Sequence, residues 1–400
     1  MSWEMRKLSE VASLVRGVTF SKAEGVDRQE NGRVPVIRAG SIQKTLLVNN
    51  GQIWVPQEKV KPHQLIKEND ILMCTSSGSS DLVGKCAKSD ADYDVSFGAF
   101  CAGIRPDLAK VSPSYLYHFL CSPTFKNWTK NSSGANIKNI RASELAEFKI
   151  PLPPLEEQKR IAAILDKADA IRQKRKQSIA LADEFLRSVF LEMFGDPVTN
   201  TKGWVLGSMA DFGGFKNGLN YSRDENGVEL SYIGVGDFKS HSKLDCIENL
   251  SKIQLNENPD DGYLLKDNDI LFVRSNGNKA LVGRCLTVHP GKHKVTFSGF
   301  CIRYRVQKIE ELNPTFLNYC MRIPSMKNAM LKGGQGANIQ NINQKTLTGL
   351  MFPIPPIELQ KDFESLVSRY QVFIERALDG ANNDTALFAS LSQKAFSGQL

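Results

Sequence analysis

The sequence predicts a mixed α/β (α+β) protein with an internal repeat, in which two homologous globules are separated by two long helices that pack on each other. Three observations predict this architecture. Long segments of the first half recur in the second half, and each copy begins with short apolar runs broken by glycine and asparagine turns. Each copy then ends in a long, uninterrupted heptad pattern.

The repeat is carried by ordered pairs of matching segments. Because a fixed order of several matches is far more specific than any one of them, half of the chain is interpreted as a diverged copy of the other half. The matches are Lys67–Leu72 with Lys266–Leu271, Cys74–Cys86 with Val273–Cys285, Ser96–Cys101 with Thr296–Cys301, Gly134–Ile140 with Gly336–Ile342, and Pro151–Gln158 with Pro353–Gln360.

The two globules are expected at residues 1–154 and 196–356. Their short β-branched and aromatic runs, such as Ile71 to Thr75 and Ile270 to Arg274, are typical of strands. Short helical patterns such as Pro113 to Cys121 lie between them. Each globule is therefore expected to be a mixed α/β fold.

The long helices are expected at residues 155–195 and 357–400. A Pro-x-Pro-Pro sequence fixes an extended approach, and acidic residues suited to a helix N-terminus follow it. The first helical pattern runs to Phe194, where Gly195 and Pro197 end it. At 1.5 Å per residue such a helix is about 57 Å long, more than one small domain buries.

Apolar residues at alternating steps of four and three predict a coiled-coil seam on each helix. Arg175 is the one charged residue in the first seam, and Gly380 and Asp384 predict a bend or a frayed contact in the second. The alternative is that each helix packs separately on its own globule. The predicted seam positions are Ile164, Ala168, Ile171, Phe185 and Val189 in the first helix, and Leu366, Tyr370, Phe373, Leu387 and Leu391 in the second.

Composition limits the classes of protein that remain. The chain has 400 residues and a formal net charge of +8, which suits a polyanionic partner without proving one. No signal-peptide core and no run of about 18 apolar residues is present, so a cytoplasmic protein without a membrane segment is expected. The eight cysteines form no Cys-x-x-Cys pair, and three pairs of them occupy equivalent positions, so they are interpreted as buried hydrophobic residues.

Signatures of catalysis are missing. The chain contains no phosphate-binding loop, dinucleotide fingerprint, His-Glu-x-x-His zinc motif or Gly-x-Ser-x-Gly nucleophile elbow. His289 and His293 are separated by Pro290 and Gly291, which forbid a helix, so a loop pair is the better interpretation than a metal site. No catalytic, cofactor-binding or metal-binding residue is predicted.

Two similar globules on a helical spacer suggest a molecule that reads two similar but unequal objects, for which two half-sites on DNA are suitable. In the loop that matches between the two copies, the residues that form the scaffold agree, but the polar side chains at the tip of the loop differ. Side chains of these types can hydrogen-bond to the edges of DNA bases. A surface turn around Gly78 and Gly277 that simply drifted remains an open alternative. The candidate residues in this loop are Thr75, Ser76, Ser77 and Ser79 in the first copy, and Arg274, Ser275, Asn276, Asn278 and Lys279 in the second.

A second matched loop, Gly134–Ile140 with Gly336–Ile342, supplies amide and cationic groups beside flexible glycines, which suits phosphate contact. Asn136 and Asn338 could equally cap a turn, and the two roles can coexist. Further cations could complete a basic surface. The candidates are Asn136, Lys138, Asn139, Asn338, Gln340 and Asn341 in the loops, with Arg16, Lys22, Lys85, Arg141, Arg284 and Lys332 as the cations.

The ordered set of motifs resembles the specificity subunits of type I restriction-modification enzymes. The resemblance rests on the two-copy plan, on Gly-Ala-Asn-Ile before Pro151–Gln158 and its twin, and on the closing segment Gln393–Leu400. Arg16–Thr19 and Ser76–Ser79 through Ser96–Cys101 also look like target-recognition domains of that family. The resemblance covers essentially the whole chain.

The resemblance implies that each globule is a target-recognition domain for one half of a bipartite, asymmetric DNA sequence. The helices would form an antiparallel coiled coil that sets the gap and docks two methyltransferase (modification) subunits. Those subunits would bind S-adenosylmethionine and methylate adenine, and restriction/translocase subunits would use ATP and Mg²⁺. This chain would be non-catalytic and hold no cofactor.

Two other classes of function remain as alternatives. A coiled-coil adaptor that bridges protein partners would show no sequence-specific, salt-dependent DNA affinity. A fused nuclease or methyltransferase would show activity as an isolated chain.

Overall fold

The computed structural model describes residues 3–78, 82–131, 138–222, 224–238, 243–244, 247–332 and 341–400. The chain divides into two compact units. Unit 1 contains residues 1–177 and 378–400, and unit 2 contains residues 178–377. The division cuts both long helices, so each unit includes half of each helix.

Unit 1 contains a four-stranded antiparallel sheet in the order β2-β9-β5-β7. A three-stranded sheet in the order β4-β3-β8 and two short ribbons, β1-β11 and β6-β10, complete its strands. The strands are β1 (Met5–Lys7), β2 (Ala12–Arg16), β3 (Arg33–Ile37), β4 (Ile53–Pro56), β5 (Ile71–Cys74), β6 (Ser76–Ser77), β7 (Cys86–Lys88), β8 (Ser96–Phe97), β9 (Cys101–Pro106), β10 (Lys138–Asn139) and β11 (Lys149–Pro151).

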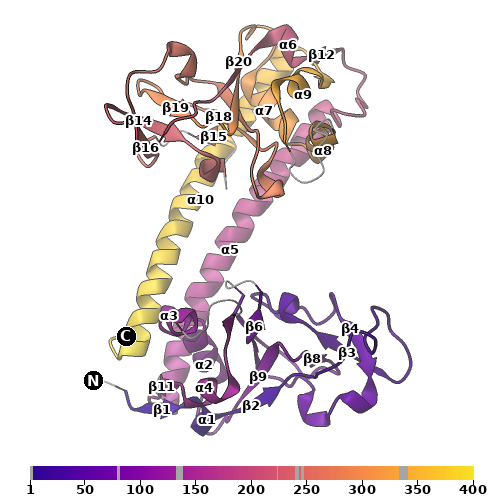
Figure 1. The fold of residues 1–400 in the computed structure, drawn as a ribbon, viewed down its shortest axis with the longest axis vertical. Helices are drawn as coiled ribbons and strands as arrows, with labels where there is room; N and C mark the ends of the chain where they lie inside the picture. Colours follow the sequence, from indigo (N-terminus) through magenta and orange to yellow (C-terminus); the bar gives the residue numbers. More distant parts are fainter. Residues whose placement is uncertain are drawn as a thin grey trace. The chain divides into compact units, whose positions relative to one another are not determined.

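Strand β5 is buried on both faces, because it lies inside the sheet between two apolar clusters. Ile71 and Met73 pack into the cluster formed with the helices, and Leu72 and Cys74 pack into a second cluster on the opposite face. Alternate residues of a strand point to opposite faces, so a strand covered on both sides is a continuous apolar run. Helix α2 lies beside α5, where His118 contacts Asp166, and β3 and β4 lie on the far side of unit 1 (Figure 1). The short helices are α1 (Leu8–Val11), α2 (Pro113–Leu120), α3 (Pro123–Asn131) and α4 (Ala142–Glu147).

Unit 2 repeats this plan. Its main sheet has the order β13-β20-β17-β18-β15, and β16-β14-β19 and β12-β21 correspond to the smaller sheets. In β17, Ile270 and Phe272 pack toward the helices and Leu271 and Val273 pack toward the opposite cluster. The elements are β12 (Leu206–Ser208), α6 (Met209–Phe212), β13 (Gly213–Asn217), β14 (Val228–Ile233), β15 (Lys243–Leu244), β16 (Ser251–Leu255), β17 (Asp269–Val273), β18 (Cys285–Val288), β19 (Val295–Phe297), β20 (Cys301–Val306), α7 (Pro314–Arg322), α8 (Pro324–Lys332), α9 (Gln344–Thr348) and β21 (Met351–Pro353).

The cysteines lie in these cores. Cys86 and Cys285 pack between sheet and helices, and Cys101 and Cys301 pack in the clusters on the opposite face. Burial raises the pKa of Cys101, Cys285 and Cys301 to about 12, so these thiols stay protonated at neutral pH. The interpretation as buried hydrophobic residues is confirmed for Cys74, Cys86, Cys101, Cys285, Cys301 and Cys320. Cys121 is only half-buried, and Cys246 lies outside the described residues.

The long helices are α5 (Leu155–Phe194) and α10 (Ile357–Ser397). A buried glutamine in the first turn of each helix closes the proline motif. The side-chain amide of Gln158 donates to the carbonyls of Lys110 and Pro153 and accepts from the Ser112 amide. Gln360 makes the equivalent three bonds in unit 2. The motif therefore fixes each long helix to the N-terminus of α2 or α7, since Ser112 and its counterpart cap those helices.

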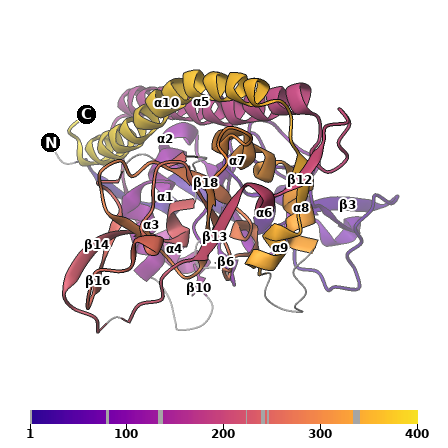
Figure 2. The same ribbon diagram turned by 90° about the horizontal axis from the view of Figure 1, so that it is seen from above.

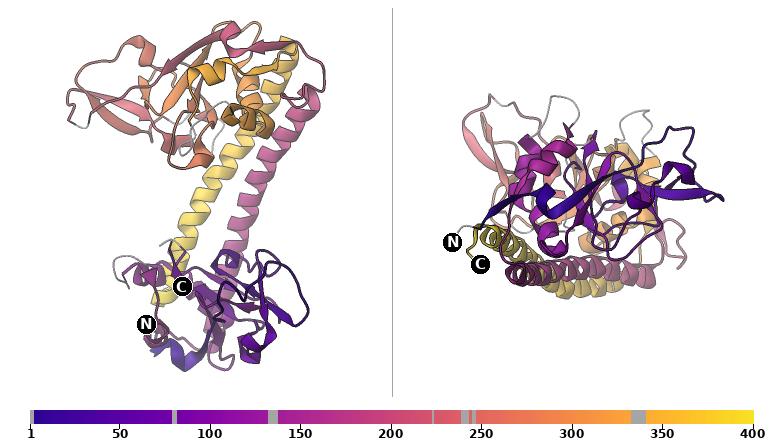
Figure 3. Two further views of the ribbon diagram at one scale, coloured as in Figure 1. Left: turned by 45° about the vertical axis from the view of Figure 1, so that its right-hand side comes forward. Right: turned by 90° about the horizontal axis from the view of Figure 1, so that it is seen from below.

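The two long helices run antiparallel within each unit, where they lie side by side (Figures 1 and 3). In unit 1, Arg172 stacks on Phe388, and Arg175 pairs with Asp384 at 2.8 Å. Residue numbers therefore rise along α5 in the direction in which they fall along α10. In unit 2 the same reversal is seen, because the ring of Phe185 stacks on Tyr370 and those of Phe190 and Phe194 pack on Phe363.

The polar middle of the helices differs from its prediction. Helix α10 continues without interruption through Gly380, so it does not fray there. A Cβ atom on Gly380 would collide with the guanidinium of Arg175. The glycine thus makes room for Arg175, whose Nε donates to the carboxylate of Asp384. The two charged residues that interrupt the predicted seams are partners of each other.

The predicted seam is wrong by one residue at four of its ten positions. Ala168, Val189, Tyr370 and Leu391 are half-buried as expected, and Ile164 and Leu366 are half-buried at its edge. Ile171, Phe185, Phe373 and Leu387 are exposed instead, although the ring of Phe185 stacks on that of Tyr370. The positions that turn inward are the next residues along the chain, namely Leu165, Arg172, Ile179 and Leu186 on α5, and Val367, Ile374 and Phe388 on α10.

The corrected register predicts unequal effects of two neighbouring substitutions. Leu186 is 1% exposed within the unit 2 core, and Phe185 is 43% exposed. We expect Leu186→Ala to lower the free energy of unfolding by about 2 to 3 kcal/mol, because it leaves a cavity. We expect Phe185→Ala to lower it by about 1 kcal/mol, the scale of one aromatic pair. Chemical denaturation of the two variants measures both values, and a larger cost for Phe185→Ala would support the original seam.

Among the described residues, no helix is both long enough and apolar enough to cross a lipid bilayer.

Candidate nucleic-acid interface

One end of the main sheet gathers the predicted polar residues in each unit. Because neighbouring strands in the order β2-β9-β5-β7 are antiparallel, β2 and β5 end where β9 and β7 begin. We call the resulting surface of unit 1 polar edge 1, and the equivalent surface of unit 2 polar edge 2. Polar edge 1 consists of Arg16, Thr75–Ser77, Lys85, Phe100 and Lys138–Asn139, and polar edge 2 of Asn217, Arg274–Asn276, Arg284, Phe300 and Asn341.

The two matched loops of the sequence meet at these edges. In polar edge 1, β6 pairs with β10, so that Ser76 lies opposite Asn139. In polar edge 2, Ser275 forms a single bridge with Asn341. The ribbon β6-β10 lies on the side of unit 1 that faces away from α5 (Figure 2). The structure therefore joins two segments that the sequence analysis could only treat separately.

The residues that directly follow β2 pack closely against the turn between β8 and β9, and those that follow β13 pack in the same way against the turn between β19 and β20. A Cβ atom on Gly17 would collide with the carbonyl of Gly98, and one on Gly218 would collide with the carbonyl of Ser298. The Arg16-Gly17 pair and its counterpart Asn217-Gly218 are thus pressed against the turn, and both Arg16 and Asn217 are exposed. Among the described contacts, the Asn217 side chain accepts a 3.1 Å hydrogen bond from Gln344.

Several candidates of polar edge 1 have roles inside the protein. Thr75 is buried, and its hydroxyl donates to the Phe100 carbonyl at 3.1 Å, so its prediction as a base-reading residue is wrong. Lys85 is half-buried and donates to Gln43 at 2.6 Å. Ser76 and Ser77 are half-buried and Asn139 is exposed. Lys22 is exposed, but it lies in a turn beyond β2, and no contact of the described residues joins it to the edge.

In polar edge 2 the asparagines shape the loop. The side-chain carbonyl of Asn276 accepts from the Asn278 amide at 2.8 Å, and that of Asn278 accepts from the Ala280 amide at 3.0 Å. Asn278 thereby caps the short 3-10 helix Lys279–Leu281. These contacts favour the turn-forming alternative for both asparagines. Lys279 is exposed beside them.

The two arginines of polar edge 2 differ. Arg284 is held inward, since its guanidinium donates to the carbonyls of Ala280 and Phe238, each at 3.3 Å. Arg274 is half-buried, and its guanidinium makes no hydrogen bond or ion pair within the described part of the chain. Its backbone is fixed by bonds to Phe300 and Ile342 at 2.8 and 3.0 Å. Arg274 is therefore a positioned cation with donors to offer to a ligand.

Some candidates lie outside the described residues, so their predicted roles stay predictions. These are Ser79, Asn136, Asn338 and Gln340. Arg141 and Lys332 are exposed at the ends of α4 and α8. Within the described part of the chain, no group of three or more His, Cys, Asp or Glu residues is arranged to hold a metal ion.

Sequence reasoning missed three features of the edges. In the sequence Phe100 and Phe300 stand out only as part of the match of Ser96–Cys101 with Thr296–Cys301, yet both residues are exposed. Asn217 could have been found by extending the repeat, because Asn217-Gly-Leu matches Arg16-Gly-Val. Lys327 donates to the Ala280 carbonyl at 3.0 Å, and burial, then nearby Arg284, lowers its pKa. Lys327 comes from α8, and no sequence signal placed that helix beside the loop.

A repeated α+β chain with paired long helices and two polar edges defines a class of two-unit proteins with an internal repeat. The family model described as the type I restriction modification DNA specificity domain matches residues 1–181 and 201–376. The chain therefore belongs to this family and is a specificity subunit of a type I restriction-modification enzyme, that is, a non-catalytic component.

Similar proteins cover the whole chain. The specificity subunit of the type I restriction enzyme StySPI from Salmonella potsdam is 30% identical, over 100% of this chain and 89% of its own length. The EcoKI specificity subunit of Escherichia coli K12 is 29% identical over the same shares. The crystal structure of a type I S subunit from M. genitalium is similar in fold, with 15% identity, a TM-score of 0.55, and coverage of 99% of this chain and 96% of that one. A chain from a structural study of assembly and conformational transition in a type I system has 16% identity and a TM-score of 0.52, over 100% and 98% of the two chains.

Proposed function

We propose that this chain reads a bipartite, asymmetric sequence in double-stranded DNA, one half with each polar edge. The observation that carries the proposal is that the same strand scaffold builds the edge twice with different side chains. Arg16 in one edge is matched by Asn217 in the other, and Thr75 is matched by Arg274. Equal scaffolds with unequal tips suit two different half-sites.

The chemistry of the edges supports DNA as the ligand. An arginine whose guanidinium has no partner among the described residues can donate two parallel hydrogen bonds to guanine, which is the arrangement open to Arg274. Exposed cations such as Arg16 and Lys279 suit phosphate contacts, which position a protein without reading sequence. The net charge of +8 favours the same ligand.

We further propose that α5 and α10 hold two methyltransferase (modification) subunits, and that restriction/translocase subunits join them in the full complex. Exposed apolar residues on these helices support protein docking, since large apolar side chains in contact with water favour burial by a partner. S-adenosylmethionine, ATP and Mg²⁺ belong in this proposal to the partner subunits. The large exposed apolar residues on the two helices, among those that the structure describes, are Ile171, Leu181, Phe185, Leu191, Val372, Phe373 and Leu387.

The test is single-molecule sequencing of methylated adenines in cells that express this chain together with its methyltransferase, compared with cells that lack only this chain. A new two-part motif that disappears without the chain is the expected result. If methyltransferase binding and activity are confirmed and no motif appears, the result supports a protein-bridging adaptor instead.

Arg274→Ala is expected to relax one base position in the half-site read by unit 2. Loss of a bidentate contact costs about 1 to 3 kcal/mol of discrimination, and the other half-site keeps its sequence. The methylation motif of the variant measures this directly. Lys279→Ala is the matched control, because it removes an exposed charge from the same loop and is expected to weaken binding without changing base preference. An unchanged motif in Arg274→Ala would count against the assignment of this loop.

A further inference from the structure

An exposed phenylalanine occupies the same place in both polar edges. Phe100 is 70% exposed and Phe300 is 63% exposed, more than any other phenylalanine in the described part of the chain. Each lies in the turn before the buried cysteine that begins β9 or β20. A single exposed apolar residue is ordinary in a soluble protein, so exposure alone assigns no role.

The backbone of this turn is held firmly. The Phe100 carbonyl accepts from the amides of Thr75 and Ser76 at 2.9 and 3.2 Å. The residue before it is also fixed, since the Ala99 amide donates to the Val18 carbonyl at 3.0 Å, and the Cys101 amide donates to Gly98 at 2.9 Å.

The turn in unit 2 is held in the same way. The Phe300 carbonyl accepts from the Arg274 amide at 2.8 Å, and the Gly299 amide donates to Leu219 at 2.7 Å. Each ring therefore projects from a backbone that is already ordered, which lowers the entropic cost of using it in binding.

The surroundings of the rings are polar. The backbone carbonyl of Phe300 accepts a hydrogen bond from the backbone amide of Arg274, whose guanidinium has no partner among the described residues. The carbonyl of Arg274 accepts in turn from the amide of Ile342, which follows Asn341. Phe100 is bonded to Ser76, which lies opposite Asn139. An apolar ring among donors and acceptors matches the major-groove edge of an A·T pair, where the thymine methyl group lies beside hydrogen-bonding atoms.

We propose that Phe100 and Phe300 are specificity-determining residues, and that each makes an apolar contact with the C5 methyl group of a thymine in the half-site that its unit reads. This inference rests on the proposed function. The inference adds to the proposed function a defined chemical group on the DNA. It also adds a mode of recognition that both edges share, although their polar side chains differ.

The first measurement removes the methyl group from the DNA and leaves the protein unchanged. Once sequencing has defined the motif, each half-site thymine is replaced singly with deoxyuridine, and duplex binding by the complex with methyltransferase subunits is measured by competition. At one position in each half-site we expect a loss of about fourfold, the scale of one buried methyl group. If no thymine in either half-site shows such a loss, the inference is overturned.

The second measurement links that position to the ring. Phe300→Ala is expected to abolish the effect of deoxyuridine in the unit 2 half-site and to relax that base position in the methylation motif. Phe300→Leu, which keeps an apolar side chain, is expected to retain most of both. Phe100→Ala is expected to do the same in the other half-site only.

A matched control comes from the far end of the same strand. Ile309 is exposed and follows β20, whereas Phe300 precedes it, so Ile309→Ala removes similar apolar surface away from the edge. Its motif is expected to match the wild type. A wild-type motif that persists in Phe300→Ala, with its deoxyuridine effect intact, would overturn this inference and leave the proposed function standing. Absence of any motif with the wild-type chain would instead overturn the proposed function.

Discussion

Replacing Asp269 with alanine is expected to lower the free energy of unfolding of unit 2 by about 3 kcal/mol, because it removes the buried carboxylate of a partly buried ion pair and leaves its hydrogen-bond donors without that partner. Asp269 is buried in β17, and its two oxygens accept from Nε and Nη2 of Arg305, both at 2.7 Å. One oxygen also accepts from the Lys266 amide at 2.8 Å. Arg305 in turn donates to the Leu264 carbonyl, so the pair joins the strand to the turn that precedes it.

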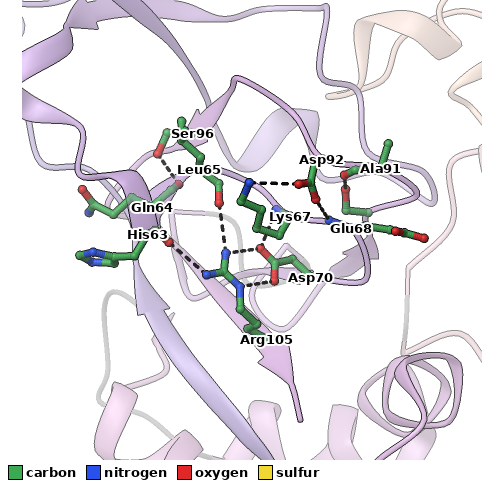
Figure 4. Close-up of polar contacts among 11 residues, drawn as sticks. His63, Gln64, Leu65, Lys67, Glu68, Asp70, Ala91, Asp92, Ser96 and Arg105 are labelled. Atoms are coloured by element: carbon green, nitrogen blue, oxygen red, sulfur yellow. Dashed lines mark hydrogen bonds and ion pairs between the residues drawn. The ribbon is translucent and has the colours of Figure 1, made fainter. Parts of the chain in front are cut away.

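An equivalent ion pair between aspartate and arginine, which we call the brace, exists in unit 1. Asp70 accepts from Arg105 Nε and Nη2 at 2.8 and 2.7 Å and from the Lys67 amide, and Arg105 donates to Leu65 (Figure 4). Asp70→Ala is therefore expected to destabilise unit 1 to a similar extent. The ion pair is a physical reason for the match of Lys67–Leu72 with Lys266–Leu271 in the sequence, since the aspartate of this segment pairs with an equivalent arginine in each unit.

Denaturation followed by circular dichroism and by calorimetry measures the effect in the full chain. Asp260→Ala is the matched control, because Asp260 is exposed and its side chain makes no hydrogen bond within the described residues. The control is expected to change the free energy of unfolding by less than about 0.5 kcal/mol. An equal cost for both variants would mean that the brace contributes nothing beyond removal of an acidic residue.

Replacing Gln360 with leucine is expected to lower the free energy of unfolding of unit 2 by about 2 to 4 kcal/mol. The substitution leaves two buried backbone groups without this partner, namely the carbonyl of Pro355 and the amide of Asn313, and it also removes the bond to the carbonyl of Glu311, which is exposed. Each unsatisfied group costs about 1 to 3 kcal/mol, and the apolar gain of leucine offsets part of the sum.

Lys361→Leu is the control for this variant, because it places the same side chain at the exposed neighbouring position. It breaks only a surface ion pair with Glu358, so a change of less than about 0.5 kcal/mol is expected. Thermal unfolding of both variants decides between the expected order and its reverse. If Gln360→Leu were as stable as the control, the proline motif would act through its prolines alone.

The repeat and the long helices could be predicted because their signals are local or recur along the chain. The proline motif announces a helix start, and Gly195 adopts a positive φ of 78° at its end, where glycine is favoured. Matching segments reveal equivalent elements without knowledge of how they fold. The role of the glutamine in that motif was not predictable, because its partners Lys110 and Ser112 lie more than 40 residues away.

The seam shows the limit of a periodic pattern. At most of its disputed positions two neighbouring residues are both apolar, such as Phe185 and Leu186, or Phe373 and Ile374. Either residue satisfies the heptad spacing, and only the place where a helix meets its globule decides between them. At one position the charged Arg172 turns inward in place of Ile171, because Phe388 and Asp169 receive its guanidinium.

The sequence by itself determined that this chain is a twofold-repeated α+β protein, which loops differ between the copies, and which family it resembles. Tertiary structure alone decided which side chains of those loops face outward. Thr75 turns in to the Phe100 carbonyl and Arg284 binds carbonyls, whereas Arg274 and Phe300 remain available. The physical reason is that an inward turn requires a partner for each polar group, and those partners come from segments distant in the chain.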